Sequence, residues 1–167
     1  IFYFRRRLDQ IDRKLRQDGW NKTRPIADSL TEIESTTLGI LGVGAIGNKI
    51  SKIALSLGMD VIGLTRRPDL MPEGIKPVSK IELFKQSDIV LISCPLNDET
   101  RGMVDAATIS LMKPTAILIN IARGPIVDSA AIVTALKEGR LAGVAMDVHD
   151  QHPLDGSELV FRSEEHT

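Results

Sequence analysis

The chain has 167 residues, which is enough for one sizeable hydrophobic core, and its formal net charge is −1. Near-neutrality excludes a general attraction to nucleic acid or anionic membranes, and no apolar run approaches the ~20 residues of a membrane span. Cys94 is the only cysteine, which excludes an internal disulfide framework and indicates a reducing, cytoplasmic compartment. We expect Cys94 to be a small core residue.

Both ends of the chain are unusual. It begins with Ile1, and its last residues, RSEEHT, resemble the translation of a sequencing-library adapter. We therefore expect a fragment truncated at both ends, in which residues 155–167 are a truncated tail and residues 162–167 derive from the adapter. The adapter-like residues are excluded from the fold prediction.

Residues 1–17 predict a basic amphipathic helix with apolar residues on one side: Phe4, Leu8, Ile11 and Leu15. Its charges are typical of a solvated face rather than of a nucleic-acid site. Residues 20–35, which contain Trp20 and Pro25, predict a polar connection. An apolar stripe and a lone tryptophan with few local partners indicate an interface, so we expect residues 1–35 to make interdomain or dimer contacts.

Residues 37–57 predict a buried strand, a glycine-rich turn and a helix that runs to Leu57. The turn contains a G-x-G-x-x-G motif, which in this setting is typical of a dinucleotide site. Gly42 would permit a tight turn, Gly44 the close approach of a pyrophosphate, and Gly47 the close packing of helix on strand. A glycine turn without a ligand is the alternative.

Strands and helices continue to alternate after this unit. The sequence predicts strands at residues 60–64, 75–78, 88–93, 116–120 and 142–146, and helices at residues 79–85, 105–112 and 129–138, with Ser79 and Asp128 as caps. Such alternation implies right-handed crossovers and an α/β fold, a Rossmann-type doubly wound parallel sheet in three layers. We expect this domain to span residues 36–154.

The end of the second strand bears on the choice of cofactor. An acidic residue about 20 positions after the glycines normally binds the ribose hydroxyls, but this place holds Thr65, followed by Arg66 and Arg67. A hydroxyl and two guanidinium groups can bind a 2′-phosphate that a carboxylate would repel. The residues favour NADP(H) over NAD(H), unless the arginines are solvated loop charges.

Ligands of open α/β sheets lie outside the carboxyl ends of the strands. Arg123, in the loop after the fifth strand, is the most informative residue there. A guanidinium beside a nicotinamide can hold a substrate carboxylate bidentately and polarise the adjacent carbonyl. An ordinary surface arginine is the alternative.

Four segments carry a family resemblance: ILGVGAIGNKI, SCPLNDETRGMVD, LMKPTAILINIARGPIVD and LAGVAMDVHDQHPL. Together they resemble the nucleotide-binding domain of the D-isomer-specific 2-hydroxyacid dehydrogenases. This family includes glyoxylate and hydroxypyruvate reductases, phosphoglycerate dehydrogenase and formate dehydrogenase. The resemblance extends from about residue 37 to residue 153.

The resemblance implies roles for individual residues. The pyrophosphate would be held by Gly42, Gly44, Ala45, Ile46 and Gly47. Thr65 takes the place of the ribose-binding aspartate, with Arg66 and Arg67 beside it. Further cofactor contacts are expected from Pro95, Thr100, Ile121, Ala122 and Asp147. Arg123 would be the catalytic arginine that binds the 2-oxo acid. The family's nucleotide-binding domains form homodimers, which would give the apolar stripe a partner.

Two departures from the family bear on catalysis. His152 stands where the family has a glutamate that keeps the catalytic histidine protonated. An imidazole would hold that charge less well and lower the pKa of the acid, or the role passes to Asp150; an ordinary loop histidine is the alternative. The family's acid histidine and its substrate domain are missing, so we expect no hydride transfer from these 167 residues alone.

The sequence thus predicts the nucleotide-binding portion of an oxidoreductase. It would transfer a hydride between NAD(P)H and a small 2-oxo or 2-hydroxy acid of the glyoxylate or hydroxypyruvate type. We expect a homodimer, with no nucleic acid, membrane or metal as a partner. Two alternatives remain: a dinucleotide-regulated, corepressor-like binding protein of the same fold, and an inactive truncated product.

Overall fold

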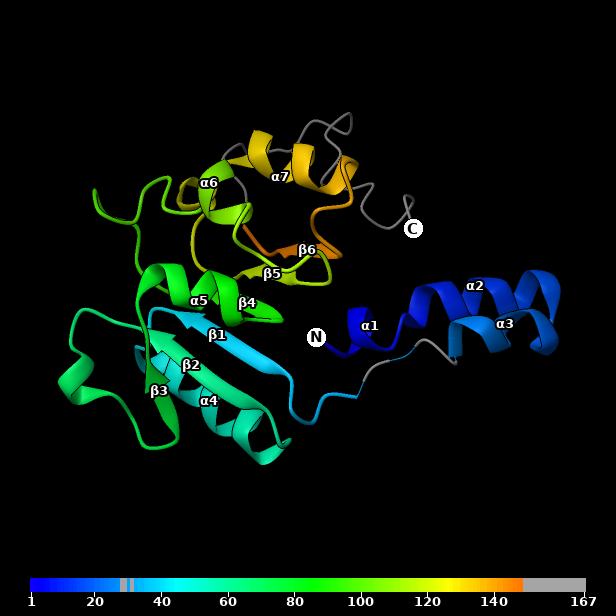
Figure 1. The fold of residues 1–167 in the computed structure, drawn as a ribbon, viewed down its shortest axis with the longest axis horizontal. Helices are drawn as coiled ribbons and strands as arrows, with labels where there is room; N and C mark the ends of the chain where they lie inside the picture. Colours follow the sequence, from blue (N-terminus) through cyan, green and yellow to red (C-terminus); the bar gives the residue numbers. More distant parts are fainter. Residues whose placement is uncertain (28–29, 31, 149–167) are drawn as a thin grey trace.

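The computed structural model describes residues 1–27, 30 and 32–148. Its centre is a six-stranded parallel sheet with the order β3-β2-β1-β4-β5-β6 (Figure 1). The strands are β1 (Thr37–Leu41), β2 (Asp60–Leu64), β3 (Ile75–Pro77), β4 (Ile89–Ile92), β5 (Ile117–Asn120) and β6 (Gly143–Met146). The strand order reverses between β1 and β4, which confirms the predicted doubly wound fold.

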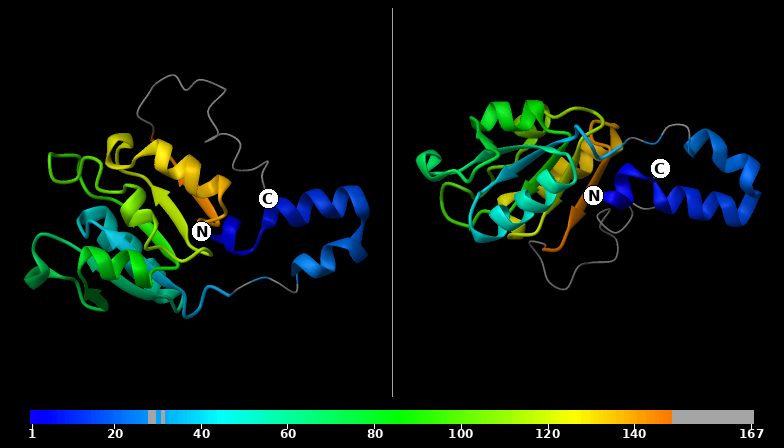
Figure 2. Two further views of the ribbon diagram at one scale, coloured as in Figure 1. Left: turned by 45° about the horizontal axis from the view of Figure 1, so that its top comes forward. Right: turned by 90° about the horizontal axis from the view of Figure 1, so that it is seen from below.

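Helices cover both faces of the sheet (Figures 1 and 2). On one face lie α5 (Lys80–Gln86), α6 (Ala106–Ile109) and α7 (Ser129–Lys137), and on the other α4 (Ala45–Ser56) and α1 (Phe2–Arg5). A hydrophobic core lies on each face of the sheet, and alternate residues of β4 contribute to the two cores. Val90 and Ile92 pack towards α5, and Ile89 and Leu91 pack towards α4. Strands buried on both faces read as continuous apolar runs, which is why they were predictable.

Local capping sets several helix boundaries. The Ser79 hydroxyl accepts a hydrogen bond from the Glu82 amide, and the Glu82 carboxylate accepts one from the Ser79 amide, at the start of α5. Asp128 accepts from two amides at the start of α7, as predicted. The helix predicted over residues 105–112 is shorter, because α6 ends at Ile109 and the chain continues in turns.

The single helix predicted over residues 1–17 is wrong. α1 ends at Arg5, and α2 (Leu8–Asp18) begins after Arg7, whose positive φ of 43° interrupts the helix. Tertiary contacts explain the break. Arg5 donates to the Thr36 hydroxyl at 2.9 Å, and Arg6 pairs with Glu32 at 3.1 Å, so α1 is held on the domain while α2 leaves it.

The polar connection predicted over residues 20–35 is wrong in part, because it begins with a helix, α3 (Trp20–Ala27). Pro25, which lacks an amide donor, argues against a helix in the sequence. The chain turns at Gly19, with φ of 75°, and α3 packs beside α2. The two helices, residues 8–27, form an arm that projects from the domain (Figures 1 and 2).

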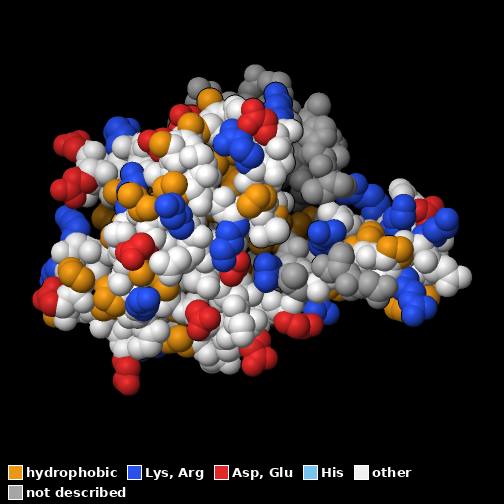
Figure 3. Space-filling view, in the orientation of Figure 1, with side chains coloured by type: hydrophobic (Ala, Val, Ile, Leu, Met, Phe, Trp, Pro, Cys, Tyr) orange, Lys and Arg blue, Asp and Glu red, His pale blue; other side chains and the backbone are white. Residues whose placement is uncertain are grey.

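Lysine and arginine side chains gather on this arm (Figure 3). Two of them have acidic partners one helical turn away: Lys14 pairs with Asp18 at 3.1 Å, and Arg16 with Asp12 at 2.9 Å. Such pairs are usual on a solvated helix face. Across the described ranges 1–27, 30 and 32–148, no helix combines the length and apolar character needed to cross a bilayer.

Asp105 provides a stability test of a cap. Its carboxylate accepts from the Thr108 amide at 2.8 Å, and the hydrogen bonds from Thr108 lower the pKa of Asp105. At neutral pH we expect Asp105→Ala to reduce the free energy of unfolding by about 1 kcal/mol, and Asp105→Asn by less, because the amide keeps an acceptor.

Because the pKa is lowered in the folded state, the ionised cap contributes fully above the unfolded pKa, near 4, and its contribution is lost as the pH falls through the folded value. The difference between wild type and Asp105→Asn, measured by denaturant unfolding, should therefore disappear in acid. A difference that does not change with pH would contradict this account.

Candidate functional site

The glycine turn between β1 and α4 is built around Gly42. Its φ is 98°, and a Cβ atom there would lie 2.6 Å from the backbone nitrogen and Cα of Cys94. The Gly42 amide donates to the Leu64 carbonyl at 2.9 Å, and the Ser93 hydroxyl donates to the Gly42 carbonyl at 2.7 Å. The turn is thus fixed to both neighbouring strand ends.

Gly47 allows α4 to lie directly on β1. A Cβ atom at this position would lie 2.6 Å from the Gly42 carbonyl oxygen and 3.1 Å from the side chain of Ile40. Any larger residue would push the helix away from the strand. Helix and strand therefore pack as closely as the motif predicts.

Gly44 differs from the other two motif glycines. Its φ of −94° suits any residue, and no atom of the described chain lies within 4 Å of the place where its Cβ would be. It is the N-cap of α4, and no side chain caps that helix. Nothing within the described structure requires a glycine here, and the missing side chain leaves the first-turn amides of α4 exposed to an external anion.

The loop after β2 begins beside this turn. The Thr65 hydroxyl accepts from the Arg67 amide at 3.4 Å, and Arg66 and Arg67 are exposed. Asp69 lies further on, in a short 3₁₀ helix over Pro68–Leu70. Two guanidinium groups thus follow the strand end where a carboxylate would otherwise bind ribose.

The loop after β4 is braced from within. The hydroxyl of the buried Thr100 donates to the Pro95 carbonyl at 2.7 Å and accepts from the Asn97 amide at 2.9 Å. Thr100 therefore shapes the loop, whereas Pro95 is exposed on its surface. Cys94 is buried, which raises the pKa of its thiol and agrees with the predicted core role.

The loop after β5 carries Arg123 on the surface. Its guanidinium Nη1 donates to the Ala122 carbonyl at 2.6 Å. Below it lies the side chain of Asn120, which is fully buried. The Asn120 Oδ1 accepts from the Ala122 amide, and Nδ2 donates to the Arg123 carbonyl, both at 3.0 Å.

Sequence reasoning did not single out Asn120. The available signal was a polar residue at the end of an apolar strand. The half-buried Ile121 and the buried Ala122 lie between Asn120 and Arg123, and the exposed Asp147 follows β6. The Asp147 amide donates to the Asn120 carbonyl at 3.0 Å.

The sheet register brings these residues to one edge. Leu41 is paired with Leu64 on one side and Ile92 on the other, and the same row continues through Asn120 to Met146. The residues that directly follow this row on its five strands are Gly42, Thr65, Ser93, Ile121 and Asp147. His152 is the one predicted site residue that lies outside the described residues. Asp150, the alternative for its role, also lies outside them.

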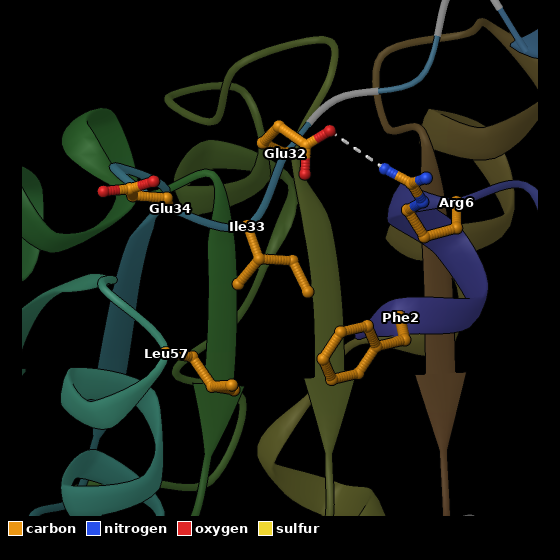
Figure 4. A pocket seen from close by; sticks show the side chains of 6 residues that line it. All are labelled: Phe2, Arg6, Glu32, Ile33, Glu34 and Leu57. Atoms are coloured by element: carbon orange, nitrogen blue, oxygen red, sulfur yellow. Dashed lines mark hydrogen bonds and ion pairs between the residues drawn. The ribbon is translucent and has the colours of Figure 1, made fainter.

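A separate hollow lies at the opposite end of the sheet. It has a volume of about 340 Å³ and is lined by Phe2, Arg6, Glu32, Ile33, Glu34 and Leu57 (Figure 4). Arg6 and Glu32 pair across it. It adjoins the segment that enters β1, so it is not part of the carboxyl-end site. Among the side chains that the structure describes, no three His, Cys, Asp or Glu residues gather to hold a metal ion.

Comparison with known proteins gives the same assignment. The family described as "D-isomer specific 2-hydroxyacid dehydrogenase, NAD binding domain" matches residues 1–166. A glyoxylate reductase of Thermococcus onnurineus is 39% identical over 161 residues, which are 92% of this chain and 48% of that protein. The chain thus spans about half the length of the relatives that it matches.

Two solved structures carry different cofactors. An NAD-dependent formate dehydrogenase from Staphylococcus aureus in complex with NAD superposes with a TM-score of 0.88 at 28% identity, covering 98% of this chain and 50% of that one. An acyclic imino acid reductase in complex with NADPH and D-Arg has a TM-score of 0.83 and 34% identity, covering 92% and 49%. The chain belongs to the D-isomer specific 2-hydroxyacid dehydrogenase family and contains its NAD(P)-binding domain.

Proposed function

We propose that this chain is the cofactor-binding half of an NADP(H)-preferring reductase that acts on a small 2-oxo acid of the glyoxylate or hydroxypyruvate type. The observation that carries the proposal is Gly44, a glycine without a conformational or packing reason at the uncapped end of α4. The similarity to a glyoxylate reductase supports the substrate class. The corepressor alternative is not favoured, because the comparisons return dehydrogenases and reductases.

The row of strand ends suits an extended dinucleotide. The amides of Ala45 and Ile46 would bind the pyrophosphate over Gly44, with Gly42 and Gly47 shaping the turn. The other contacts would come from Pro95, Thr100, Ile121, Ala122 and Asp147. When bound, the cofactor supplies or accepts the hydride.

Arg123 would hold the substrate. Its exposed guanidinium can bind the carboxylate of a 2-oxo acid bidentately and draw electron density from the neighbouring carbonyl. We assign the proton donor to a histidine outside these 167 residues, and we expect His152, at the family's glutamate position, to hold the charge of that histidine less well than a carboxylate would. The isolated chain should then bind cofactor without reducing glyoxylate.

Cofactor preference would depend on the β2 loop. Arg66 and Arg67 are exposed beside the glycine turn, and a 2′-phosphate is the part of NADPH that NADH lacks. Arginine forms strong charge-assisted hydrogen bonds with phosphate. The relatives with known ligands include both cofactors, so the preference rests on these residues.

We also propose a homodimer. Ile46 and Ile53 on α4 and Leu57 at its C-cap are 58%, 61% and 41% exposed, and Trp20 on the arm is 72% exposed. A second copy would cover these side chains, since burying exposed apolar surface on α4 and on the arm is favourable.

Gly44→Ala tests the proposed function. The new methyl group meets nothing in the described chain, so the free energy of unfolding should stay within about 1 kcal/mol of wild type. NADPH affinity, measured by fluorescence titration, should fall about tenfold or more, because the methyl occupies the pyrophosphate position.

Gly139→Ala is the matched control. Gly139 also has open space around it, but its φ is 65°, so alanine there should lower stability and leave NADPH affinity unchanged. Wild-type NADPH affinity in Gly44→Ala would refute the proposed function.

Removing both arginines tests cofactor preference. The double variant Arg66→Ala/Arg67→Ala should bind NADPH at least about tenfold more weakly, since each charge-assisted hydrogen bond is worth roughly 1.5–3 kcal/mol. NADH affinity should change little. Arg24→Ala, which removes an exposed arginine from the arm, controls for general electrostatics. Equal losses for the two cofactors would contradict a 2′-phosphate site.

The dimer is tested on α4. Ile53→Asp should convert a dimer into a monomer in sedimentation velocity at micromolar concentration, because it places a charge in the proposed interface. Lys52→Asp, at the adjacent exposed position, should leave the dimer intact. A wild-type chain that sediments as a monomer would exclude this proposal for the isolated chain.

A further inference from the structure

Asn120 is an exceptional side chain in the sheet. It ends β5, where the preceding residues Ile117 and Leu118 are buried and apolar, and its own exposure is 0%. A buried amide is costly unless its polar atoms are hydrogen-bonded, and a leucine of similar volume would avoid that cost. The position therefore needs a reason beyond filling the core.

The hydrogen bonds of Asn120 supply that reason. Its two side-chain polar atoms bind the Ala122 amide and the Arg123 carbonyl, both at 3.0 Å. These backbone groups belong to a loop and have no strand partner. The Asn120 side chain thereby gives the Ala122 amide an acceptor and gives the Arg123 carbonyl a second donor, beside the Ile126 amide at 3.4 Å.

The same loop also binds the guanidinium group of Arg123. Arg123 Nη1 donates to the Ala122 carbonyl at 2.6 Å, so the Ala122 residue is bound to Asn120 through its amide and to Arg123 through its carbonyl. The Arg123 backbone is extended, with φ of −147° and ψ of 142°. Backbone and side chain of Arg123 are thus both tied, directly or through Ala122, to the Asn120 side chain.

We propose that Asn120 is a positioning residue that sets the direction of the Arg123 guanidinium toward the bound acid. This inference rests on the proposed function, because it takes Arg123 as the substrate-binding group. In this proposal Asn120 does not touch the substrate. It acts by fixing the conformation of the loop that carries Arg123. Small displacements of such a group reduce reaction efficiency strongly.

The experiment uses the complete protein that contains this chain, with NADPH and glyoxylate. Asn120→Asp keeps an oxygen for the Ala122 amide but places a second oxygen against the Arg123 carbonyl, where Nδ2 donated. We expect kcat/KM for glyoxylate to fall about tenfold or more, while the NADPH dissociation constant changes less than about twofold.

A double-mutant cycle with Arg123→Gln separates positioning from a general structural effect. If Asn120 acts through Arg123, then Asn120→Asp should change kcat/KM by less than about twofold in the Arg123→Gln background. Ile132→Ala, on the buried face of α7, is the control for lost stability and should leave kcat/KM unchanged below its unfolding temperature. Asn120→Leu, which removes both hydrogen bonds, should reproduce the Asp phenotype.

The outcomes distinguish this inference from the proposed function. Full activity of Arg123→Gln would overturn the proposed function, and the positioning role with it. An inactive Arg123→Gln together with a fully active Asn120→Asp, or additive effects of the two changes, would overturn the positioning role alone. If Asn120→Leu fails to fold, Asn120→Asp decides, because it retains one of the two hydrogen bonds.

Discussion

The carboxyl-end site depends on the close approach of the chain after β1 to the chain after β4, at the point where both strands end. At Gly42 there is no room for one additional carbon against the backbone of Cys94. That contact lets the turn pass over the end of β4 and lets α4 lie on β1 at Gly47. Gly44, at the N-cap of α4, is left exposed to solvent. The reversal of strand order and the candidate ligand site both depend on the contact at Gly42, because the two halves of the sheet diverge from this point.

The sheet was predictable because its signals are local and redundant. Apolar runs predicted the strands other than β3 to within one residue at either end, and capping residues such as Ser79 marked helix starts. The arm was not predictable in this way. Its break at Arg7 depends on contacts between α1 and a segment about 30 residues away, which no periodicity in the sequence expresses. Pro25 also argued against a helix that packing on α2 maintains.

The site was partly predictable for a related reason. Glycines and arginines at strand ends have chemistry that a sequence displays, and the structure brings Gly42, Thr65 and Arg123 to one edge of the sheet. Asn120 was missed because its contribution is geometric: it binds backbone groups that any residue would present. The distinction between Gly44 and Gly42 likewise required the three-dimensional structure. Only the atoms that surround each glycine show that the fold requires a glycine at position 42 and does not require one at position 44.

The common register row has a consequence for how such a domain can diversify. The β2 loop and the β5 loop start from the same level of the sheet but are separated by three strand spacings of about 4.8 Å each, or roughly 14 Å. Between them lie β1 and β4, which are buried on both faces of the sheet, so a change in one loop need not disturb the other. If the β2 loop selects the cofactor and the β5 loop binds the acid, as proposed, the two properties become independently exchangeable, and a designer could replace residues 65–70 while leaving residues 121–124 as they are.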